Sequence, residues 1–451
     1  MKLPFQQSRQ IVTCEDARVE PGTLDGVTIM RYAHIYRDRT SGGVEQYLRH
    51  LDRGLLARHR LTILQMHLVK SDGGDAVEKE KVGIGQIIWV PVAIRQTESR
   101  LRGLPERLRL VRRTLRLNHK TKGRTLPASA PSFRSVLTDN SGHFRYKAAI
   151  FSGRLHPLVE SNSVDLLSVH WMSYDTAAVI RHVQRAGVPF VFINHFDNSR
   201  LASKRLREQI RQAAAIGVIS NCGIPAELNE RCVNLSDAVD TEFFDPERAQ
   251  IAEVIPRLVL LPARIETGKG HRDLINAARV LINRGVDITL GFVGAVDSEA
   301  VHRELRQSAA SMGMEGHIRF FGEVSAERVR DWYASSAVVV LPSHSEGLGR
   351  VLLEAQAMAR PVVAYNTGGV PEALVPDGTG YLVEVGNVEV LADKIEFLLT
   401  HPYDATRMGV RGQEFVRERF GAAALVQRHE KLYFGVLSGV SQSCSNVHRS
   451  T

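Results

Sequence analysis

Short apolar stretches alternate with amphipathic stretches along most of this chain. In the first half, apolar runs of strand length lie at residues 27–33, 61–68, 86–92, 164–169, 188–193 and 215–219. In the second half they lie at 257–262, 287–293, 317–321, 337–341 and 360–364, separated by helix-like segments at 270–283, 298–312, 326–334 and 350–358. Strands that alternate with helices are typical of parallel sheets covered by helices on both faces. The pattern therefore predicts an α/β fold.

The two halves of the chain repeat this pattern at similar length, with an interruption at residues 240–256. Two consecutive halves of this kind predict two Rossmann-like, doubly wound domains that face a central cleft. We expect an N-terminal extension, an N-terminal domain, a C-terminal domain, and finally a helix that returns toward the N-terminal domain before a polar tail. These four parts correspond to residues 1–25, 26–240, 241–420 and 421–451.

The composition narrows the class of protein without naming a function. The chain has 451 residues, of which 43% are hydrophobic and 24% charged, as in ordinary globular proteins. No uninterrupted apolar run reaches the length of about 18 residues that a membrane-spanning helix needs, and residues 1–20 do not read as a secretory signal. The four cysteines, which form no C-x-x-C pair, indicate neither a zinc site nor a disulfide framework. We therefore expect a cytoplasmic protein.

The formal net charge of +9 is concentrated in one segment. Residues 93–148 contain 14 Lys and Arg against three Asp and Glu, so the rest of the chain is slightly acidic. Apolar residues inside this segment recur at helical spacing, with arginines on the remaining faces: Leu101, Leu104, Leu108, Val111 and Leu115. We expect an amphipathic insert in the N-terminal domain.

Two interpretations of this insert stay open. Its leucines can pack inward in a domain helix whose arginines are solvated, or residues 95–124 can attach the protein to an anionic membrane surface on the cytoplasmic side. Nucleic acid is the least favoured partner, because residues 95–124 contain no Phe, Tyr or Trp on which bases could stack.

Two turns in the second half carry residues suited to a phosphorylated sugar. Arg264 and Lys269 follow the strand predicted at 257–262 and precede a helix, which is where a diphosphate binds in such folds. Glu346 lies in the turn before the helix predicted at 350–358, and Glu354 lies within that helix. Their carboxylates can accept hydrogen bonds from sugar or ribose hydroxyls. Solvated loops and an ordinary acidic residue at a helix start would produce the same patterns.

The first half offers a glycine turn and two histidines. Gly42 and Gly43 follow the first predicted strand, a position that suits close approach of the backbone to a ligand. His195 ends the strand at 188–193, and His170 follows the strand at 164–169. Carboxyl ends of strands face the ligand in these sheets, so either imidazole could reach the reaction centre, and we favour His195. Both could instead be structural.

Taken together, these segments resemble the retaining glycosyltransferases of family 4, which have the GT-B fold and are also called glycosyl transferases group 1. The resemblance is strong over residues 239–420 and weaker before them. It rests on Arg264, Lys269, Glu346 and Glu354, the strand and turn at 318–324, the Gly-Gly turn at 366–372, the segment 378–383, and the linker 238–246. One departure is Leu348, where many members have Phe.

The resemblance implies a role for each of these positions. Arg264 and Lys269 would hold the donor diphosphate and stabilise the leaving group, and Glu354 would bind the ribose. Glu346 and His195 would contact the donor sugar. The residues next to the nucleotide and the sugar would be Gly42, Gly43, Gly322, Glu323, Gly347, Leu348 and Gly349.

The predicted function is transfer of a hexose from a nucleotide diphosphate sugar to an acceptor hydroxyl, with retention at the anomeric carbon. The expected acceptor is lipid-linked or belongs to a cell-envelope polysaccharide, and we expect neither a metal nor a cofactor besides the donor substrate. Two alternatives stay open: a nucleotide-sugar epimerase or phosphorylase on the same scaffold, and a non-catalytic nucleotide-sugar-binding protein. The identity of the sugar, the base and the acceptor is not readable from these residues.

Overall fold

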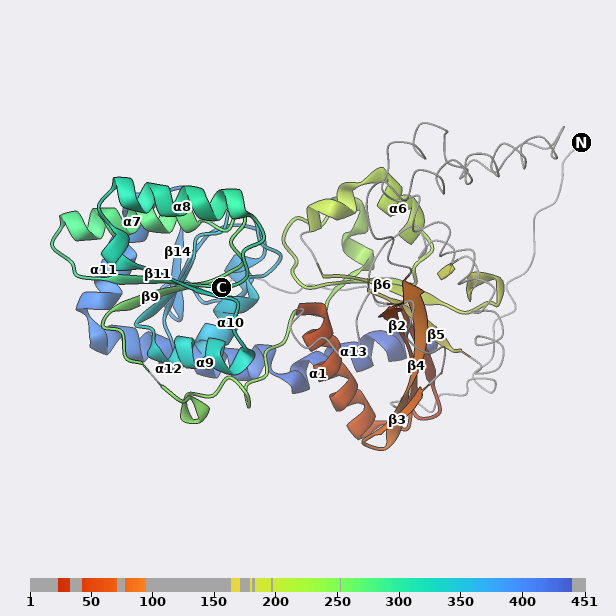
Figure 1. Cartoon of the computed structure of the whole chain (residues 1–451). Helices are drawn as coiled ribbons and strands as arrows, with labels where there is room; N and C mark the ends of the chain where they lie inside the picture. Colours follow the sequence, from red (N-terminus) through yellow and green to blue (C-terminus); the bar gives the residue numbers. More distant parts are fainter. Residues whose placement is uncertain are drawn as a thin grey trace, which may run out of the picture.

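A computed structural model gives the structure of the chain. It describes residues 23–32, 43–70, 78–94, 164–170, 179–180, 183–195, 198–251 and 253–439. Two β-sheets dominate it, and each has helices around it (Figure 1). We call the part built on the first sheet the N-terminal lobe and the part built on the second sheet the C-terminal lobe. This arrangement confirms the predicted α/β fold with two doubly wound domains.

The sheet of the N-terminal lobe runs in the order β3-β4-β2-β1-β5-β6-β7-β8. All its neighbouring strands are parallel except β3, which is antiparallel to β4. Its strands are β1 (Thr28–Tyr32), β2 (Thr62–Lys70), β3 (Glu78–Val82), β4 (Gly85–Ile94), β5 (Leu166–Val169), β6 (Phe190–Asn194), β7 (Ala215–Val218) and β8 (Cys232–Asn234). The helical elements described in this part of the chain are α1 (Gly43–Arg58), η2 (Asn198–Ala202), α6 (Lys204–Ile210) and η3 (Ala226–Arg231).

The sheet of the C-terminal lobe is fully parallel, in the order β11-β10-β9-β12-β13-β14. Its strands are β9 (Leu258–Pro262), β10 (Thr289–Val293), β11 (Ile318–Gly322), β12 (Val338–Leu341), β13 (Val362–Tyr365) and β14 (Gly380–Val383). The helices are α7 (His271–Asn283), α8 (Glu299–Ser311), α9 (Ala326–Ser335), α10 (Arg350–Ala357), α11 (Val388–Thr400) and α12 (Pro402–Phe420), with short 3-10 turns η4 (Pro246–Arg248), η5 (Glu315–His317) and η6 (Val370–Glu372).

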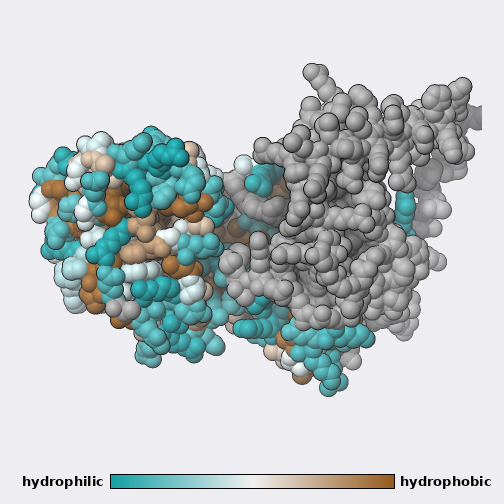
Figure 2. Space-filling view, in the orientation of Figure 1, coloured by the Kyte–Doolittle hydropathy of each residue, from teal (hydrophilic) through white to brown (hydrophobic). Residues whose placement is uncertain are grey.

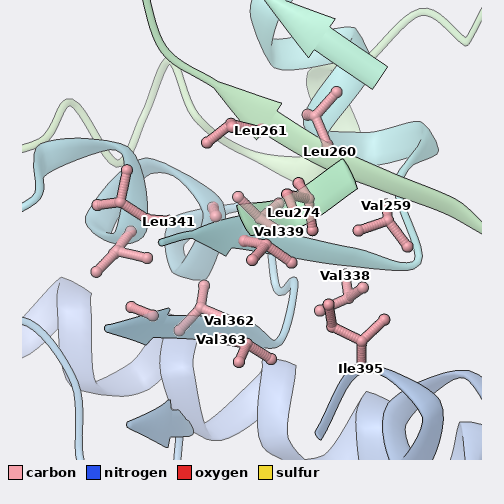
Figure 3. Close-up of a cluster of buried hydrophobic side chains, with 14 of the residues drawn as sticks. Val259, Leu260, Leu261, Leu274, Val338, Val339, Leu341, Val362, Val363 and Ile395 are labelled. Atoms are coloured by element: carbon pink, nitrogen blue, oxygen red, sulfur yellow. The ribbon is translucent and has the colours of Figure 1, made fainter. Parts of the chain in front are cut away.

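The central strands of the C-terminal lobe are buried on both faces, which explains their continuous apolar sequences. Val259, Val339 and Val363 lie on neighbouring strands and are 0–1% exposed. Leu274 of α7 and Ile395 of α11 pack against this group, as Figure 3 shows. Since every position of β9, β12 and β13 is covered, the polar side chains of these segments gather in the loops at the strand ends.

The last described helix, α13 (Ala422–Leu437), lies beside α1 in the N-terminal lobe, although it follows α12 of the C-terminal lobe (Figure 1). Leu425, Val426 and Leu432 belong to the same buried cluster as Leu51 of α1. Gly54 of α1 makes this contact close, because a Cβ there would lie 2.1 Å from Val426 Cγ2. The two helices therefore form one face of the N-terminal core.

Several predicted segments lie partly or wholly outside the described residues. Most of the basic insert at 93–148 is among them, as are Gly42 and the tail from 440 onward. In the predicted extension at 1–25, Leu24 is described and is buried in the N-terminal core, so part of that segment packs with the domain. Within the described part of the chain, no helix is both long and apolar enough to cross a membrane. The visible face of the C-terminal lobe is mostly hydrophilic, with small separate hydrophobic areas (Figure 2).

Candidate functional site

The order of the strands singles out one position at the edge of each sheet. In the C-terminal lobe, β9 lies between β10 and β12. The chain runs from β9 to β10 and β11 on one side of β9 and then crosses to β12 on the other side. In the N-terminal lobe, β1 lies between β2 and β5 in the same way. Ligands of open α/β sheets bind at the carboxyl ends of the strands beside such a switch point. A ligand is therefore expected at the loops that follow β9, β12, β1 and β5.

The loops after β9 and β12 are joined by an ion pair between Lys269 and Glu346. Lys269 Nζ lies 2.7 Å from Glu346 Oε1, and the two side chains are 23% and 14% exposed. The backbone supports this contact, because His344 N donates to the Gly268 carbonyl oxygen over 2.8 Å. The structure thus brings together a predicted phosphate-binding cation and a predicted sugar-binding carboxylate.

Gly270 allows the two loops to approach this closely. It has a positive φ of 74° at the start of α7, and a Cβ there would lie 1.9 Å from the Pro342 carbonyl oxygen. No other residue type fits both the conformation and the space. The backbone N–H groups at the start of α7 lie next to Lys269 in sequence, and a helix start of this kind favours an anion.

Arg264 lies in the same loop as Lys269 but has different partners. Its guanidinium pairs with Glu266 Oε1 at 2.9 Å and with Asp297 Oδ2 at 2.5 Å, and its side chain is 58% exposed. Asp297 follows β10, so Arg264 reaches toward the loop of the next strand in the sheet. A phosphate bound by Arg264 would have to compete with these two carboxylates.

Glu354 lies on the first turns of α10, where it is buried. Its carboxylate accepts hydrogen bonds from the Tyr333 hydroxyl at 2.9 Å and from Arg350 Nε at 3.1 Å. Burial raises the pKa of Glu354, and the charge of Arg350 opposes this rise. Arg350 also donates to Gln46 Oε1 of α1 at 2.6 Å. The carboxylate is therefore linked through one arginine to the N-terminal lobe.

The remaining predicted residues of the C-terminal lobe lie in the core, in turns or at the surface. Leu348 is 2% exposed and its side chain belongs to the core cluster. Gly349, with φ of 86°, precedes α10, and the Gly347 carbonyl oxygen lies against Gly369. Gly322 ends β11 with a φ of 70°, and Glu323 after it is exposed.

In the N-terminal lobe, the structure places both candidate histidines in one cluster. His170 Nδ1 lies 2.9 Å from His195 Nε2, and the two rings are stacked with centroids 5.2 Å apart. The ring of Tyr47 meets His195 edge-on, with centroids 4.7 Å apart. Burial lowers the pKa of His195 to about 3 and places that of His170 well below its usual value, so both imidazoles are neutral. Gly43, the described half of the predicted glycine turn, begins α1.

Sequence reasoning did not assign a role to Glu372, which joins the two lobes. This residue of η6 accepts hydrogen bonds from Ser220 Oγ at 2.7 Å, Asn221 N at 2.7 Å and Asn234 Nδ2 at 3.1 Å. All three donors follow or end strands of the N-terminal lobe. Gly369 allows the approach, since a Cβ there would lie 2.5 Å from Ser220 Oγ. The only sequence signal for Glu372 is its place after the Gly-Gly turn.

A second group that the sequence did not reveal surrounds the histidines. It comprises Arg31, Tyr47, Asp52, Ser168, His429 and Tyr433. These residues come from β1, α1, β5 and α13. His429 and Tyr433, spaced by one helical turn of α13, are the one local hint, because such spacing puts two side chains on one face.

The arrangement as a whole suits a phosphorylated, hydroxyl-rich ligand better than a metal ion. Within the described residues, no group of three or more His, Cys, Asp and Glu side chains is placed to hold a metal. The C-terminal lobe offers cations and carboxylates at the ends of adjacent strands, and the N-terminal lobe offers neutral imidazoles at the ends of β5 and β6. Cations attract phosphate, and carboxylates accept hydrogen bonds from hydroxyl groups.

Comparison with known proteins agrees with this geometry. Residues 244–415 match the family described as glycosyl transferases group 1, which confirms the resemblance seen in the sequence. A D-inositol 3-phosphate glycosyltransferase from Arthrobacter sp. (strain FB24) is 34% identical over 203 residues, which are 42% of this chain and 48% of that protein. A GDP-mannose-dependent alpha-(1-6)-phosphatidylinositol monomannoside mannosyltransferase from Mycobacterium tuberculosis is 32% identical over 196 residues, which are 40% of this chain and 50% of that protein. The alignments thus span about half the length of these two relatives.

The fold agreement extends over more of the chain than the sequence agreement. Sucrose-phosphate synthase from Thermosynechococcus elongatus superposes with a TM-score of 0.65, covering 91% of this chain and 99% of that one, at 18% identity. The chain therefore has the GT-B fold, and the residues that match the group 1 family lie in the C-terminal lobe.

Proposed function

We propose that this chain, whose residues 244–415 carry the group 1 domain, transfers a hexose from a nucleotide diphosphate sugar to an acceptor hydroxyl with retention at the anomeric carbon. The observation that carries the proposal is the Lys269–Glu346 ion pair at the carboxyl ends of β9 and β12. It joins a cation for the diphosphate to a carboxylate for the sugar at the switch point of the sheet, where such a ligand binds.

The leaving group determines what the cations would do. Breaking the bond between the anomeric carbon and the phosphate develops negative charge on the departing diphosphate, and preplaced cations stabilise that charge. Lys269 supplies one such cation, with the backbone N–H groups at the start of α7 close to it in sequence. Arg264 supplies a second if the phosphate displaces Glu266 and Asp297 from its guanidinium. These groups would take the place of a divalent ion, so we propose that the reaction needs no metal.

Glu354 would accept hydrogen bonds from the ribose hydroxyls of the donor. Arg350 and the Tyr333 hydroxyl already hold its carboxylate in one position, so little freedom is lost when the ribose binds. Glu346 would bind the sugar hydroxyls from the other side of the diphosphate, released from Lys269 as the phosphate takes its place. His195 would contact the sugar from the N-terminal lobe.

Retention would follow from attack of the acceptor on the same face that the leaving diphosphate occupies, assisted by a phosphate oxygen. We propose a lipid-linked or cell-envelope acceptor, because one of the two relatives is named for D-inositol 3-phosphate and the other for phosphatidylinositol monomannoside. Residues 95–124 would hold the protein at an anionic membrane surface on the cytoplasmic side.

The direct test is a thermal-shift panel of UDP-, GDP- and ADP-linked hexoses, followed by transfer assays with the donor that binds. A donor present at 100 times its dissociation constant stabilises the fold by about 2.7 kcal/mol, so a single member of the panel should raise the melting temperature clearly. Inositol phosphate and phosphatidylinositol vesicles are the first acceptors to offer. The anomeric configuration of the product, read by NMR, decides retention against inversion, and an excess of EDTA should leave the rate unchanged.

The alternatives give different products. An epimerase would convert the donor without an acceptor, and a phosphorylase would require inorganic phosphate and release a sugar phosphate. A non-catalytic binding protein would show the thermal shift with neither hydrolysis nor transfer. The proposal is wrong if no nucleotide sugar shifts the melting temperature, or if the bound donor is consumed equally fast without any acceptor and no glycoside forms.

A further inference from the structure

Hydrogen-bonding side chains form a continuous row through the N-terminal lobe from Tyr433 to His195, and the charge of the buried Arg31 acts on its first member. Arg31 of β1 and Ser168 of β5 are register partners in the sheet. Arg31 is fully buried, and its NH1 donates to Asp52 Oδ1 of α1 at 2.5 Å. Its charge also acts on the hydroxyl of Tyr433 from α13.

The row continues in three short steps. The Tyr433 hydroxyl lies 3.2 Å from Ser168 Oγ, and Ser168 Oγ lies 3.0 Å from His170 Nε2. His170 Nδ1 in turn lies 2.9 Å from His195 Nε2. Ser168 and His170 are 0% and 1% exposed, so water does not compete for these bonds.

The hydrogen of each bond can be assigned from the Arg31 end. A guanidinium only donates and carries a positive charge, so the Tyr433 oxygen faces it and the hydroxyl hydrogen points to Ser168. Burial raises the pKa of Tyr433, so this phenol keeps its hydrogen. The Ser168 hydroxyl, which accepts from Tyr433, keeps its own hydrogen free to donate to His170 Nε2. A neutral imidazole that accepts at Nε2 carries its hydrogen on Nδ1, so His170 donates to His195 Nε2.

The same rule determines which ring nitrogen of His195 carries the hydrogen. Because its Nε2 accepts from His170, its single hydrogen lies on Nδ1. Within the described residues, His195 Nδ1 has no hydrogen-bond partner, and the residue is partly exposed. The ring therefore offers a donor at Nδ1, on its one nitrogen that is not engaged inside the lobe.

A second contact holds the ring of His195 in place from the same helix. His429 Nδ1 donates to the Leu425 carbonyl oxygen within α13 at 3.0 Å, so its Nε2 accepts from the Tyr47 hydroxyl at 3.1 Å. Tyr47 is thereby fixed, and its ring packs edge-on against His195. Both positioning residues, Tyr433 and His429, belong to α13 and lie one helical turn apart.

We propose that α13, through Tyr433 and His429, holds His195 as the tautomer with its hydrogen on Nδ1, so that this imidazole donates a hydrogen bond to the bound sugar and does not take a proton from it. The inference rests on the proposed function for the identity of the ligand. Tyr433, Ser168 and His170 are positioning residues that act through His195.

The tautomer can be read without any substrate by long-range 1H–15N correlation NMR of the whole protein. The signals of His195 are assigned by their loss in the variant His195→Asn. We expect Nδ1 to be protonated and Nε2 to be unprotonated in the wild type. A protonated Nε2 on His195 would overturn the proposal outright.

Two variants break the row while leaving the ring packing in place. Tyr433→Phe removes only the hydroxyl, and Ser168→Ala removes the next link. In both variants, nothing keeps the hydrogen of His170 on Nδ1, so the His195 signals should move toward a mixture of tautomers. Ser168→Thr, which keeps the hydroxyl, should retain the single tautomer. Phe434→Leu is the matched control, since Phe434 packs against the same core from α13 without a polar atom. It should leave the tautomer unchanged.

Donor binding and transfer assays separate this inference from the proposed function. With a working donor, Tyr433→Phe should raise the donor dissociation constant about 2- to 10-fold, which corresponds to the net value of one hydrogen bond to the bound sugar. A variant that shows mixed tautomers with a wild-type donor dissociation constant would overturn the proposed donation to the sugar. If the wild type transfers no sugar at all, the proposed function fails while the NMR result still decides the tautomer.

Discussion

The two lobes carry their candidate chemistry in opposite forms. In the C-terminal lobe, Lys269 and Glu346 form an ion pair with both side chains partly exposed, and Arg264 is 58% exposed between two carboxylates. In the N-terminal lobe, His170 and His429 are 1% and 0% exposed and uncharged. Exposed charges can exchange one partner for another when an anionic ligand arrives. Buried neutral groups cannot exchange partners, so they contribute a fixed geometry.

The first way to sharpen this comparison is acid titration of the fold, for which we expect the largest effect. Burial lowers the pKa of His429 to about 3, against 6.5 in the unfolded chain. Below pH 6.5 the unfolded state binds a proton that the folded state does not, so stability is complete above 6.5 and falls as the pH drops toward 3. The loss is about 1.4 kcal/mol per pH unit for this one residue, or about 5 kcal/mol at pH 3.

Urea unfolding from pH 8 to pH 4 measures this dependence. His429→Gln should flatten the slope below pH 6.5, whereas His401→Gln, which replaces an exposed histidine of the C-terminal lobe, should leave it unchanged. A stability that is level between pH 6.5 and 4 would mean that the imidazoles of the N-terminal lobe are not held neutral.

Arg350→Met tests an ion pair of the C-terminal lobe that is largely buried, with the side chains of Arg350 and Glu354 15% and 12% exposed. Glu354 would keep its carboxylate in the interior without its counter-charge, and breaking a buried pair in this way costs about 3–5 kcal/mol. The matched control is Arg284→Met, which loses ion pairs with Asp393 and Glu396 at the surface and should change the free energy of unfolding far less. Urea unfolding of both variants gives the two values.

The same Arg350 variant should weaken donor binding, because Arg350 would no longer hold the Glu354 carboxylate in position for the ribose hydroxyls. Burial already raises the pKa of Glu354, and removal of Arg350 would raise it further. The donor dissociation constant, measured by titration calorimetry, should rise. Equal unfolding free energies for Arg350→Met and Arg284→Met would show that the largely buried ion pair of Arg350 contributes no more to stability than the surface ion pairs of Arg284.

Lys269→Ala probes the exchangeable ion pair. We expect kcat to fall about 100- to 1,000-fold, the usual cost of removing one group that stabilises developing negative charge. The melting temperature should change little, because a partly exposed pair contributes about 1 kcal/mol or less to the fold. Lys394→Ala, at a surface lysine that lies over the ring of Tyr381, should leave kcat unaltered. A rate near that of the wild type in Lys269→Ala would remove this residue from the site.

Glu372→Gln gives the smallest expected effect and tests the contact between the two regions. A glutamine keeps one carbonyl oxygen but loses the charge that strengthens the hydrogen bonds from Ser220, Asn221 and Asn234, at a cost of about 1–2 kcal/mol. Glu384→Gln, at an exposed carboxylate of the same lobe, should stay within about 0.5 kcal/mol of the wild type. Indistinguishable urea midpoints for these two variants would show that Glu372 does not hold the lobes together.

The parts of the fold that the sequence predicted are those with a local signal. Strands such as β9 and β12, which are buried on both faces, read as short continuous apolar runs between helices. Three strands, β3, β8 and β14, were not predicted, and the first two were missed for physical reasons. The charged Glu78–Val82 of β3 lies at the sheet edge, where few side chains need burial, and β8 is only three residues long. Neither has the alternation or apolar content from which a strand is predicted.

The site divides in the same way. Lys269 and Glu346 sit in turns whose own sequence shows a strand end, a glycine and a helix start, so they could be found without tertiary structure. Their mutual contact could not, because it depends on β9 and β12 being neighbours in the sheet. In the row that ends at His195, only the two histidines had such a signal. Tyr47 and His429, which lie beside the row, are 382 residues apart, and only the packing of α13 on α1 brings them together.

The position of α13 also has a consequence for how the chain acquires its structure during synthesis. The ribosome produces β1 and α1 first, but their core lacks Leu425, Leu432 and Tyr433 until α13 has emerged. The C-terminal lobe, whose core cluster reaches from Ile219 to Phe420, is complete before that point. The lobe that is translated first is therefore the last to be finished, and its apolar surface under α13 stays uncovered throughout translation of the other lobe. Long-range closure of this kind is slow and leaves an intermediate prone to aggregation. Ribosome-stalled chains that end before α13 should accordingly be bound by chaperones through the N-terminal lobe.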